Sequence, residues 1–529
     1  MKYATLTRRS VMLVIGSALL MSMLLAGCGG DDEQISVPTG AQAGDLLGLE
    51  TCAYEVDGEE YPADCGTLIV PENRNDPTSR LIALPVVRVR AAGENPDEPI
   101  FRFAGGAGLS NMTFKLTPWF LEDHDVVLVG YRGVDGSVRL DCPEVAAEFR
   151  RAGGEDMLNQ AALEALAASF ANCANRLEGE GVDLAGYTVT ELIDDMEAAR
   201  LALGYDRINL FSWSWGTDVA RIYSYMYPEH IHRSVMIGVD VPGGVIHEAE
   251  TVDTLLGYYA ELCAQDAVCS TRTNDLAETM RTVSHDMPEL WLLLPINPGL
   301  MKAVTSNFLE LTSEAPSIID VWLSAAEGDA SGMAALSIIG RYVYAGASVW
   351  GHNAALRSSM GEFDATRDYL AELNPPDSII GSPATTVAYA EYTAWPAHLI
   401  PEEYRMIQAS DVETLLISGS IDFDTPAELA RDVLLPSLSN GQQVILSEFG
   451  HVSDIASRQP EALRHLLINY YATGVSDDSL YVYQEVDFEV GFGFPEQAKL
   501  AVAVMVLLPI GLVALVWFVV RKRRRRSQL

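Results

Sequence analysis

Three side chains of this sequence have the types and the order that nucleophilic acyl transfer requires. Ser214 lies in the segment 212–216, Ser-Trp-Ser-Trp-Gly, after an apolar run that predicts a buried strand and before a run that predicts a helix. Asp422 or Asp424, and then His451, each follow a later predicted strand. A serine hydroxyl is a weak nucleophile until a base takes its proton and a third group orients that base. The sequence therefore predicts a serine nucleophile, a histidine base and an aspartate that holds the histidine.

The segment around Ser214 is typical of a tight turn from strand to helix. Such a turn strains the backbone so that the serine Oγ stands clear of the sheet, and small residues two positions away let strand and helix approach. Gly216 fits the second of these positions, whereas Ser212 stands where glycine is usual. Because Ser-x-Ser-x-Gly also fits an ordinary turn, the assignment of Ser214 depends on residues elsewhere in the chain.

A glycine-rich loop supplies the remaining part of this chemistry. The backbone N–H of Trp215 is expected to donate to the developing oxyanion, and Gly106 in the loop 105–108, Gly-Gly-Ala-Gly, is placed to supply a second N–H. Each such donor contributes roughly 3 to 4 kcal/mol of transition-state stabilisation. The loop has neither the spacing of a phosphate-binding loop nor the acidic residue of a dinucleotide fingerprint, and no Cys/His cluster has metal-site spacing. We therefore expect no cofactor and no metal.

The elements that must position these residues alternate between buried strands and helices. This rhythm predicts an α/β fold with a mostly parallel sheet and helices on both faces. It runs through residues 49–244, is interrupted by a mostly helical segment at 245–410, and returns at 411–474. A helical insertion between sheet strands predicts a lid over the carboxyl ends of the strands, where ligands of open α/β sheets bind. Residues 475–499 are expected to form a stalk.

Both ends of the chain predict attachment to a bacterial cytoplasmic membrane. Residues 1–27 are typical of a lipoprotein signal peptide, Cys28 is the predicted lipidation site, and 28–48 form a polar tether. A non-lipidated signal peptide is the alternative, and either the general or the twin-arginine export route is possible. The apolar run 500–520 predicts a transmembrane helix, and the basic residues 521–529 predict a cytoplasmic tail. The body between the two anchors would then face outward.

Charge and cysteine usage agree with an exported hydrolase. The net charge of -38 repels nucleic acid, which excludes it as a partner. Six cysteines besides Cys28 indicate disulfides in an exported body. Many connectivities are possible, and the simplest pairs neighbours in the sequence: Cys52 with Cys65, Cys142 with Cys173, and Cys263 with Cys269.

Several motifs together resemble the α/β-hydrolase family that contains proline iminopeptidases and the secreted tripeptidyl aminopeptidases (TAP-like). They are the loop Gly105-Gly106-Ala107-Gly108, the segment Gly130-Tyr131-Arg132-Gly133, the tripeptide Asp141-Cys142-Pro143, the turn 212–217, and 422–426, which matches Asp-x-x-Thr-Pro. The last motif favours Asp422 over Asp424. The pair Cys263/Cys269 and Gly328-Asp329 look like the tripeptidyl branch. Ala107, Gly130 and Ser212 depart from the family pattern, which carries proline, aspartate and glycine there.

This resemblance implies an enzyme that cuts short peptides near a free N-terminus. Such an enzyme needs acidic groups in its lid to hold the α-ammonium group of the substrate, and the candidates are Glu310, Glu314, Asp320 and Glu391. A carboxylester hydrolase would use the same machinery and is the alternative enzyme. A catalytically silent surface protein that binds a partner with the same fold is the alternative outside the enzymes. The oligomeric state is open.

Overall fold

The computed structural model describes residues 35–526 except 57, 116–117, 152–155, 245–247 and 364–365, with backbone alone at 370, 387, 508, 510–515 and 520–526. The predicted signal peptide and the lipidation candidate Cys28 lie outside the described residues. All the elements that follow belong to one compact unit, Val37–Leu529.

A twisted sheet carries the residues singled out above, and its described part has nine strands in the order β1-β2-β3-β5-β4-β6-β7-β10-β11. The six strands from β5 to β11 in this order run parallel, and β1, β2 and β3 are antiparallel at one edge. Their bounds are β1 Leu46–Val56, β2 Glu59–Pro71, β3 Leu81–Val89, β4 Asp97–Phe103, β5 His124–Val129, β6 Ile208–Ser214, β7 Ile231–Val239, β10 Thr414–Gly419 and β11 Gly441–Leu446. The carboxyl ends of the parallel strands therefore share one edge.

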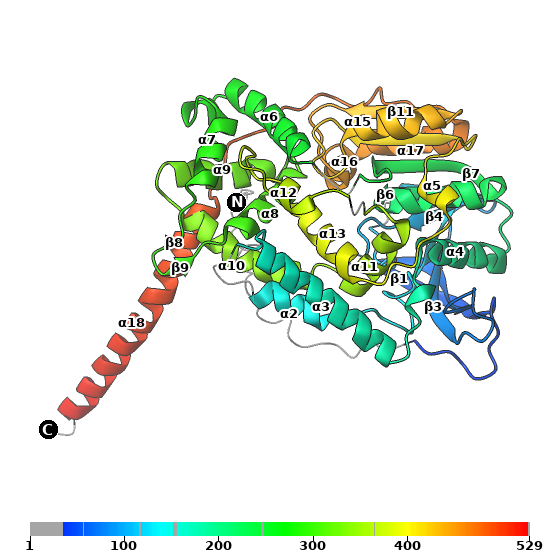
Figure 1. Cartoon of the computed structure of the whole chain (residues 1–529), viewed down its shortest axis with the longest axis horizontal. Helices are drawn as coiled ribbons and strands as arrows, with labels where there is room; N and C mark the ends of the chain where they lie inside the picture. Colours follow the sequence, from blue (N-terminus) through cyan, green and yellow to red (C-terminus); the bar gives the residue numbers. More distant parts are fainter. Residues whose placement is uncertain are drawn as a thin grey trace, which may run out of the picture. The chain divides into compact units, whose positions relative to one another are not determined.

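Helices cover both faces of this sheet (Figure 1). Side chains alternate between the faces along each strand, so Val127 lies in one hydrophobic cluster and Val126 in the other. The first cluster includes α4 (Val189–Leu203) and α5 (Gly216–Met226), and the second includes α16 (Val452–Ser457) and α17 (Pro460–Thr473). Burial on two faces explains why the strands read as continuous apolar runs in the sequence.

Between β7 and β10 the chain forms a mostly helical insertion, which we define as residues 249–405. Its elements are α6 Ala249–Gln265, α7 Leu276–His285, β8 Leu290–Trp291, β9 Leu294–Pro295, α8 Pro298–Leu309, α9 Ala315–Ala326, α10 Ser331–Gly346, α11 Trp350–Met360, α12 Tyr369–Leu373, α13 Pro383–Ala394 and α14 Glu402–Arg405. The insertion has its own hydrophobic core, shared with α2 (Pro143–Arg151) and α3 (Gln160–Gly179). Figure 1 shows α2 and α3 beside α13, away from the strands.

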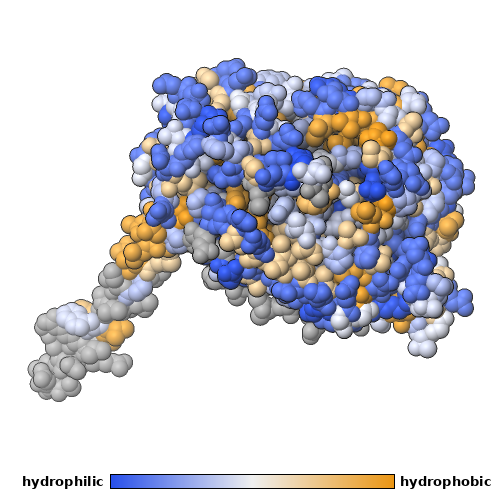
Figure 2. Space-filling model, in the orientation of Figure 1, coloured by the Kyte–Doolittle hydropathy of each residue, from blue (hydrophilic) through white to orange (hydrophobic). Residues whose placement is uncertain are grey.

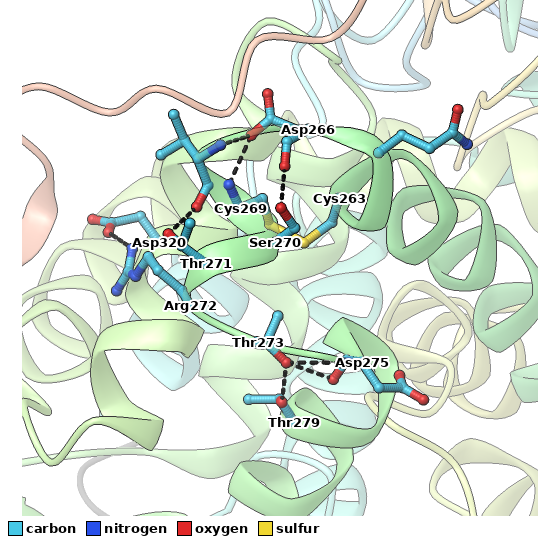
Figure 3. The surroundings of a disulfide bond; sticks show 12 residues. Cys263, Asp266, Cys269, Ser270, Thr271, Arg272, Thr273, Asp275, Thr279 and Asp320 are labelled. Carbon is cyan, nitrogen blue, oxygen red and sulfur yellow. Dashed lines mark hydrogen bonds and ion pairs between the residues drawn. A yellow bond between two sulfur atoms is a disulfide. The ribbon is translucent and has the colours of Figure 1, made fainter.

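Three disulfides pair neighbouring cysteines, which confirms the simplest pairing. They join Cys52 to Cys65, Cys142 to Cys173, and Cys263 to Cys269. Figure 3 shows the third bridge, where Asp266 accepts from the backbone N–H of Cys269 at 2.7 Å. In the same region Arg272 pairs with Asp320 at 2.6 Å. Asp320 is therefore bound to an arginine of the insertion.

The last helix, α18 (Phe494–Arg526), begins on the insertion and packs against α9 and α10. Ser331 Oγ donates to the carbonyl of Pro495 at 3.1 Å, and Lys499 Nζ lies 2.8 Å from Asp329 Oδ2. Figure 2 shows apolar side chains along the described part of this helix. Leu500 and Leu507 of this helix are exposed.

The prediction of a transmembrane helix at 500–520 is wrong. Across the part of the chain that the structure describes, no helix combines the length and apolar character that crossing a bilayer requires. A span needs about 20 consecutive apolar side chains. The first turns of α18 carry the charged residues Glu496 and Lys499 and pack against α9 and α10. The cytoplasmic placement of 521–529 depended on this span and falls with it.

We expect the three disulfides to stabilise the fold unequally, because a longer closed loop loses more entropy when it is cross-linked. Cys142 and Cys173 are 31 residues apart, and Cys263 and Cys269 are 6 apart. Replacing the first pair by serine should lower the free energy of unfolding by about 4 kcal/mol, and replacing the second by about 2 kcal/mol. Urea denaturation of both double variants at one pH measures the difference, and equal losses would contradict this ranking.

Candidate functional site

The backbone at Ser214 has the strained turn that the sequence predicts. β6 ends at Ser214, whose φ of 51° is left-handed, and α5 begins two residues later at Gly216. This conformation costs a residue with a side chain roughly 1 to 2 kcal/mol. A Cβ at Gly105 would lie 2.7 Å from Ser214 Cβ, and a Cβ at Gly216 would collide with the carbonyl of Phe103. Both positions therefore need glycine, and both hold the serine at the edge of the sheet.

Ser212 does not point at the nucleophile. It is buried, and its Oγ donates to the carbonyl of Val235 on the neighbouring strand β7 at 3.1 Å. Because the hydroxyl is satisfied inside the sheet, a side chain at this position is accommodated without contact with the site.

The loop after β10 brings Asp422 to His451. Asp422 is fully buried, and its Oδ2 lies 2.8 Å from His451 Nδ1. Its carboxylate also accepts from the backbone N–H groups of Asp424 and Thr425, at 2.9 and 2.8 Å, and from the Thr425 hydroxyl at 2.9 Å. Asp422, rather than Asp424, is thus the carboxylate at Nδ1. The sequence analysis does not predict this role for Thr425. The motif Asp-x-x-Thr-Pro contains that threonine and is the sequence signal for it.

Two contacts that the sequence did not reveal place the imidazole of His451. Its backbone N–H donates to the carbonyl of Glu310 in the insertion at 2.6 Å. On the opposite side, Gly238 of β7 has a φ of 60°, and a Cβ there would lie 2.9 Å from His451 Cε1. Glycine at 238 therefore makes room for the ring.

Asp424 contacts both the serine and the histidine. Its Oδ2 lies 3.5 Å from Ser214 Oγ and 3.3 Å from His451 Nε2. Burial alone would lower the pKa of His451, but Asp422, Asp424 and Glu310 together raise this pKa to about 10. The imidazole is therefore charged at neutral pH in this arrangement.

The glycine-rich loop lies against the turn, as its predicted role in an oxyanion hole requires. Gly106 has a φ of 76°, and Trp215 stands at the start of α5, where N–H groups have no acceptor within the helix. The N–H of Gly108 donates to His352 Nδ1 of α11 at 2.8 Å. Burial, with help from Arg132, lowers the pKa of His352 to about 3, so this nitrogen stays an acceptor. The insertion thus holds the loop through a histidine that the sequence did not single out.

A cavity of about 180 Å³ opens beside these residues, and Glu310, Glu391, Asp424 and Arg357 are among those that line it. Glu391 is fully buried, and neither of its carboxylate oxygens has a hydrogen-bond partner among the described residues. Burial raises the pKa of Glu391 to about 8, although Arg357 opposes the shift. Burial and the charge of Asp424 likewise raise the pKa of Glu310 to about 8.

The other two acidic candidates lie elsewhere. Glu314 is not among the residues that line this cavity, and Asp320 pairs with Arg272. The structure therefore brings two of the four candidate carboxylates, Glu310 and Glu391, to the cavity beside Ser214.

Residues 98–306 match the family model described as alpha/beta hydrolase fold. The chain carries an α/β-hydrolase domain. The fold that the strand rhythm and the motifs predicted, with its mostly parallel sheet, is confirmed.

The chain is also similar to curated peptidases. It is 28% identical over 228 residues to the tripeptidyl aminopeptidase of Streptomyces coelicolor, covering 39% of this chain and 40% of that protein. It is 25% identical over 222 residues to the serine protease Hip1 of Mycobacterium tuberculosis, covering 39% of this chain and 42% of that protein. The chain thus spans about 40% of the length of these relatives. These relatives confirm the resemblance to the TAP-like α/β hydrolases.

Among solved structures, the chain resembles the 2-hydroxy-6-oxo-6-phenylhexa-2,4-dienoate hydrolase from Rhodococcus sp. strain RHA1. The two are 10% identical, and the match covers 81% of this chain and 100% of the other, with a TM-score of 0.37.

Gly238→Ala should displace the imidazole of His451, because the new Cβ would lie 2.9 Å from Cε1 at a left-handed backbone position. A displacement of about 1 Å at a reacting group lowers the rate on the order of 100-fold. We expect that loss in the rate at which an active-site phosphonate labels the protein. Gly257→Ala in α6, where a Cβ meets nothing within 4 Å, is the control and should label normally. Normal labelling of the Gly238 variant would refute this role.

Proposed function

We propose that this chain is an exported serine hydrolase that releases residues or short peptides from the free N-termini of peptides. The observation that carries the proposal is the cavity lined by Asp424, which contacts Ser214, and by Glu391, whose buried carboxylate has no hydrogen-bond partner among the described residues. A buried carboxylate without a partner is costly. A cationic group of a ligand would offset that cost, and the α-ammonium group of a peptide is such a cation.

The catalytic steps follow from the order of the residues at the strand ends. Ser214 Oγ attacks the substrate carbonyl while His451 takes its proton, and His451 then returns the proton to the leaving amine. Asp422 holds the imidazole in the tautomer that this exchange needs. The N–H groups of Trp215 and Gly106 bind the oxyanion. Water then attacks the acyl-enzyme and regenerates Ser214.

Selection of a free N-terminus is assigned to Glu391, with Glu310 as a second carboxylate. At neutral pH the raised pKa of Glu391 keeps it largely protonated in the empty cavity. An ammonium group stabilises the ionised form, so its binding lowers this pKa and releases a proton. The similarity to the tripeptidyl aminopeptidase of Streptomyces coelicolor supports this assignment.

We place the enzyme outside the cytoplasm. The three disulfides support this location, because such bridges persist in oxidising compartments. Lipidation at Cys28 would hold the exported chain on the outer side of the membrane.

Ser214→Ala should abolish labelling by a fluorophosphonate probe, since the probe reacts with the activated serine oxygen. Ser212→Ala is the matched control, because Ser212 Oγ donates to Val235 and not into the site. Gel fluorescence of both variants and the native protein measures the result. A native protein that does not label at any pH would refute the hydrolase and leave the silent binding protein.

Glu391→Gln should raise KM for a tripeptidyl anilide with a free N-terminus by about 10- to 100-fold, because the amide forfeits a charged hydrogen bond worth roughly 1.5 to 3 kcal/mol. The value of kcat should change little. Glu314→Gln changes an acidic residue outside the cavity lining and is the control. Steady-state kinetics with free and N-acetylated anilides gives the answer. Equal cleavage of both by the native protein would refute the aminopeptidase, and faster cleavage of short-chain esters would identify an esterase.

A further inference from the structure

Asp424 occupies the place where the nucleophile and the base should meet. Among the described residues, the hydrogen-bond contact of Ser214 Oγ is with Asp424 Oδ2 at 3.5 Å, and the same oxygen lies 3.3 Å from His451 Nε2. The Asp424 side chain is 39% exposed and lines the cavity that holds Glu391. Asp424 thus contacts the catalytic residues and also lines the cavity.

This arrangement blocks the base. With Asp422 at Nδ1 and Asp424 at Nε2, each imidazole nitrogen faces a carboxylate oxygen, and each must carry a proton to donate to it. An imidazole that donates from both nitrogens is a cation and has no lone pair to take the proton of Ser214. His451 must therefore lose one proton before it can act as a base.

The charges around the ring all favour this blocked state. Asp422 and Asp424 face it from the loop after β10, and Glu310 faces it from the end of α8. On its own helix, the Asp454 carboxylate is taken up by Thr312 and by the N–H of Gly450. From β7, the uncharged Gly238 faces the ring. Of these groups, Asp424 is the one that contacts Nε2 of His451, the nitrogen that must lose its proton before the base can act.

We propose that Asp424 is a positioning residue that keeps His451 blocked until a cationic group of the substrate, bound in the adjoining cavity, draws its carboxylate away. This inference rests on the proposed function and deepens it. The ammonium group in the cavity that Glu391 and Asp424 both line pairs with Asp424 as well as with Glu391. The Nε2 proton of His451 then passes to solvent water, and Nε2 accepts the hydrogen bond of Ser214. No covalent bond other than this N–H changes. A substrate without the cation binds to an enzyme whose base is still charged.

Removing the carboxylate should free the base without any substrate cation. We expect the rate of labelling of Ser214 by an uncharged fluorophosphonate to rise with pH to a midpoint near 10 in the native protein, as the pKa of His451 requires. In Asp424→Asn and Asp424→Ser the midpoint should fall by at least about one pH unit, which makes labelling at pH 7 roughly tenfold faster. Asp411→Asn, an exposed aspartate after the insertion, is the control and should keep the native midpoint.

A second readout separates this role from simple packing. At pH 7 both Asp424 variants should raise kcat for an N-acetylated tripeptidyl anilide about tenfold, and change kcat for the free-amine substrate less. Equal midpoints in native and variant proteins, or an unchanged ratio of the two kcat values, would overturn the inference while the hydrolase stands. Absence of labelling in every protein would instead remove the hydrolase, and the inference with it.

Discussion

The left-handed backbone at Ser214 is the constraint on which the rest of the site depends. It is unfavourable for serine by itself, so the close approach of Gly105 and Gly216 must hold it. That approach also fixes the start of α5 and the glycine-rich loop beside it. A single strained residue thus sets the position of the nucleophile and of the groups that would receive the oxyanion.

The insertion contributes contacts to the residues of the candidate site. Its Glu310 carbonyl binds the backbone of His451, its Thr312 binds Asp454 in the helix after that histidine, and its His352 binds the loop at Gly108. The same insertion supplies Glu391 to the cavity. The insertion therefore supplies both the groups that would select a substrate and groups that hold the reacting residues. A movement of the insertion would displace both sets together.

Local sequence patterns predicted the parts of this structure that depend on residues close together in the sequence. Apolar strands buried on two faces, the turn at Ser214 and the order of Asp422 and His451 are such patterns, and so is the pairing of nearby cysteines. Gly238, His352 and Asp424 act across long sequence separations, and their roles depend on which segments the fold brings together. The transmembrane prediction used hydropathy alone, which takes no account of how α18 packs on α9 and α10.

The attachment of α18 has a mechanical consequence. Its first turns are bound to Asp329 and Ser331, at the start of α10, and Tyr344 at the other end of α10 lines the cavity. A load applied at the carboxyl end of the chain would therefore reach the wall of the cavity before it reached the sheet. A bulky fusion placed there would therefore disturb the insertion first, and the strands of the sheet only through it.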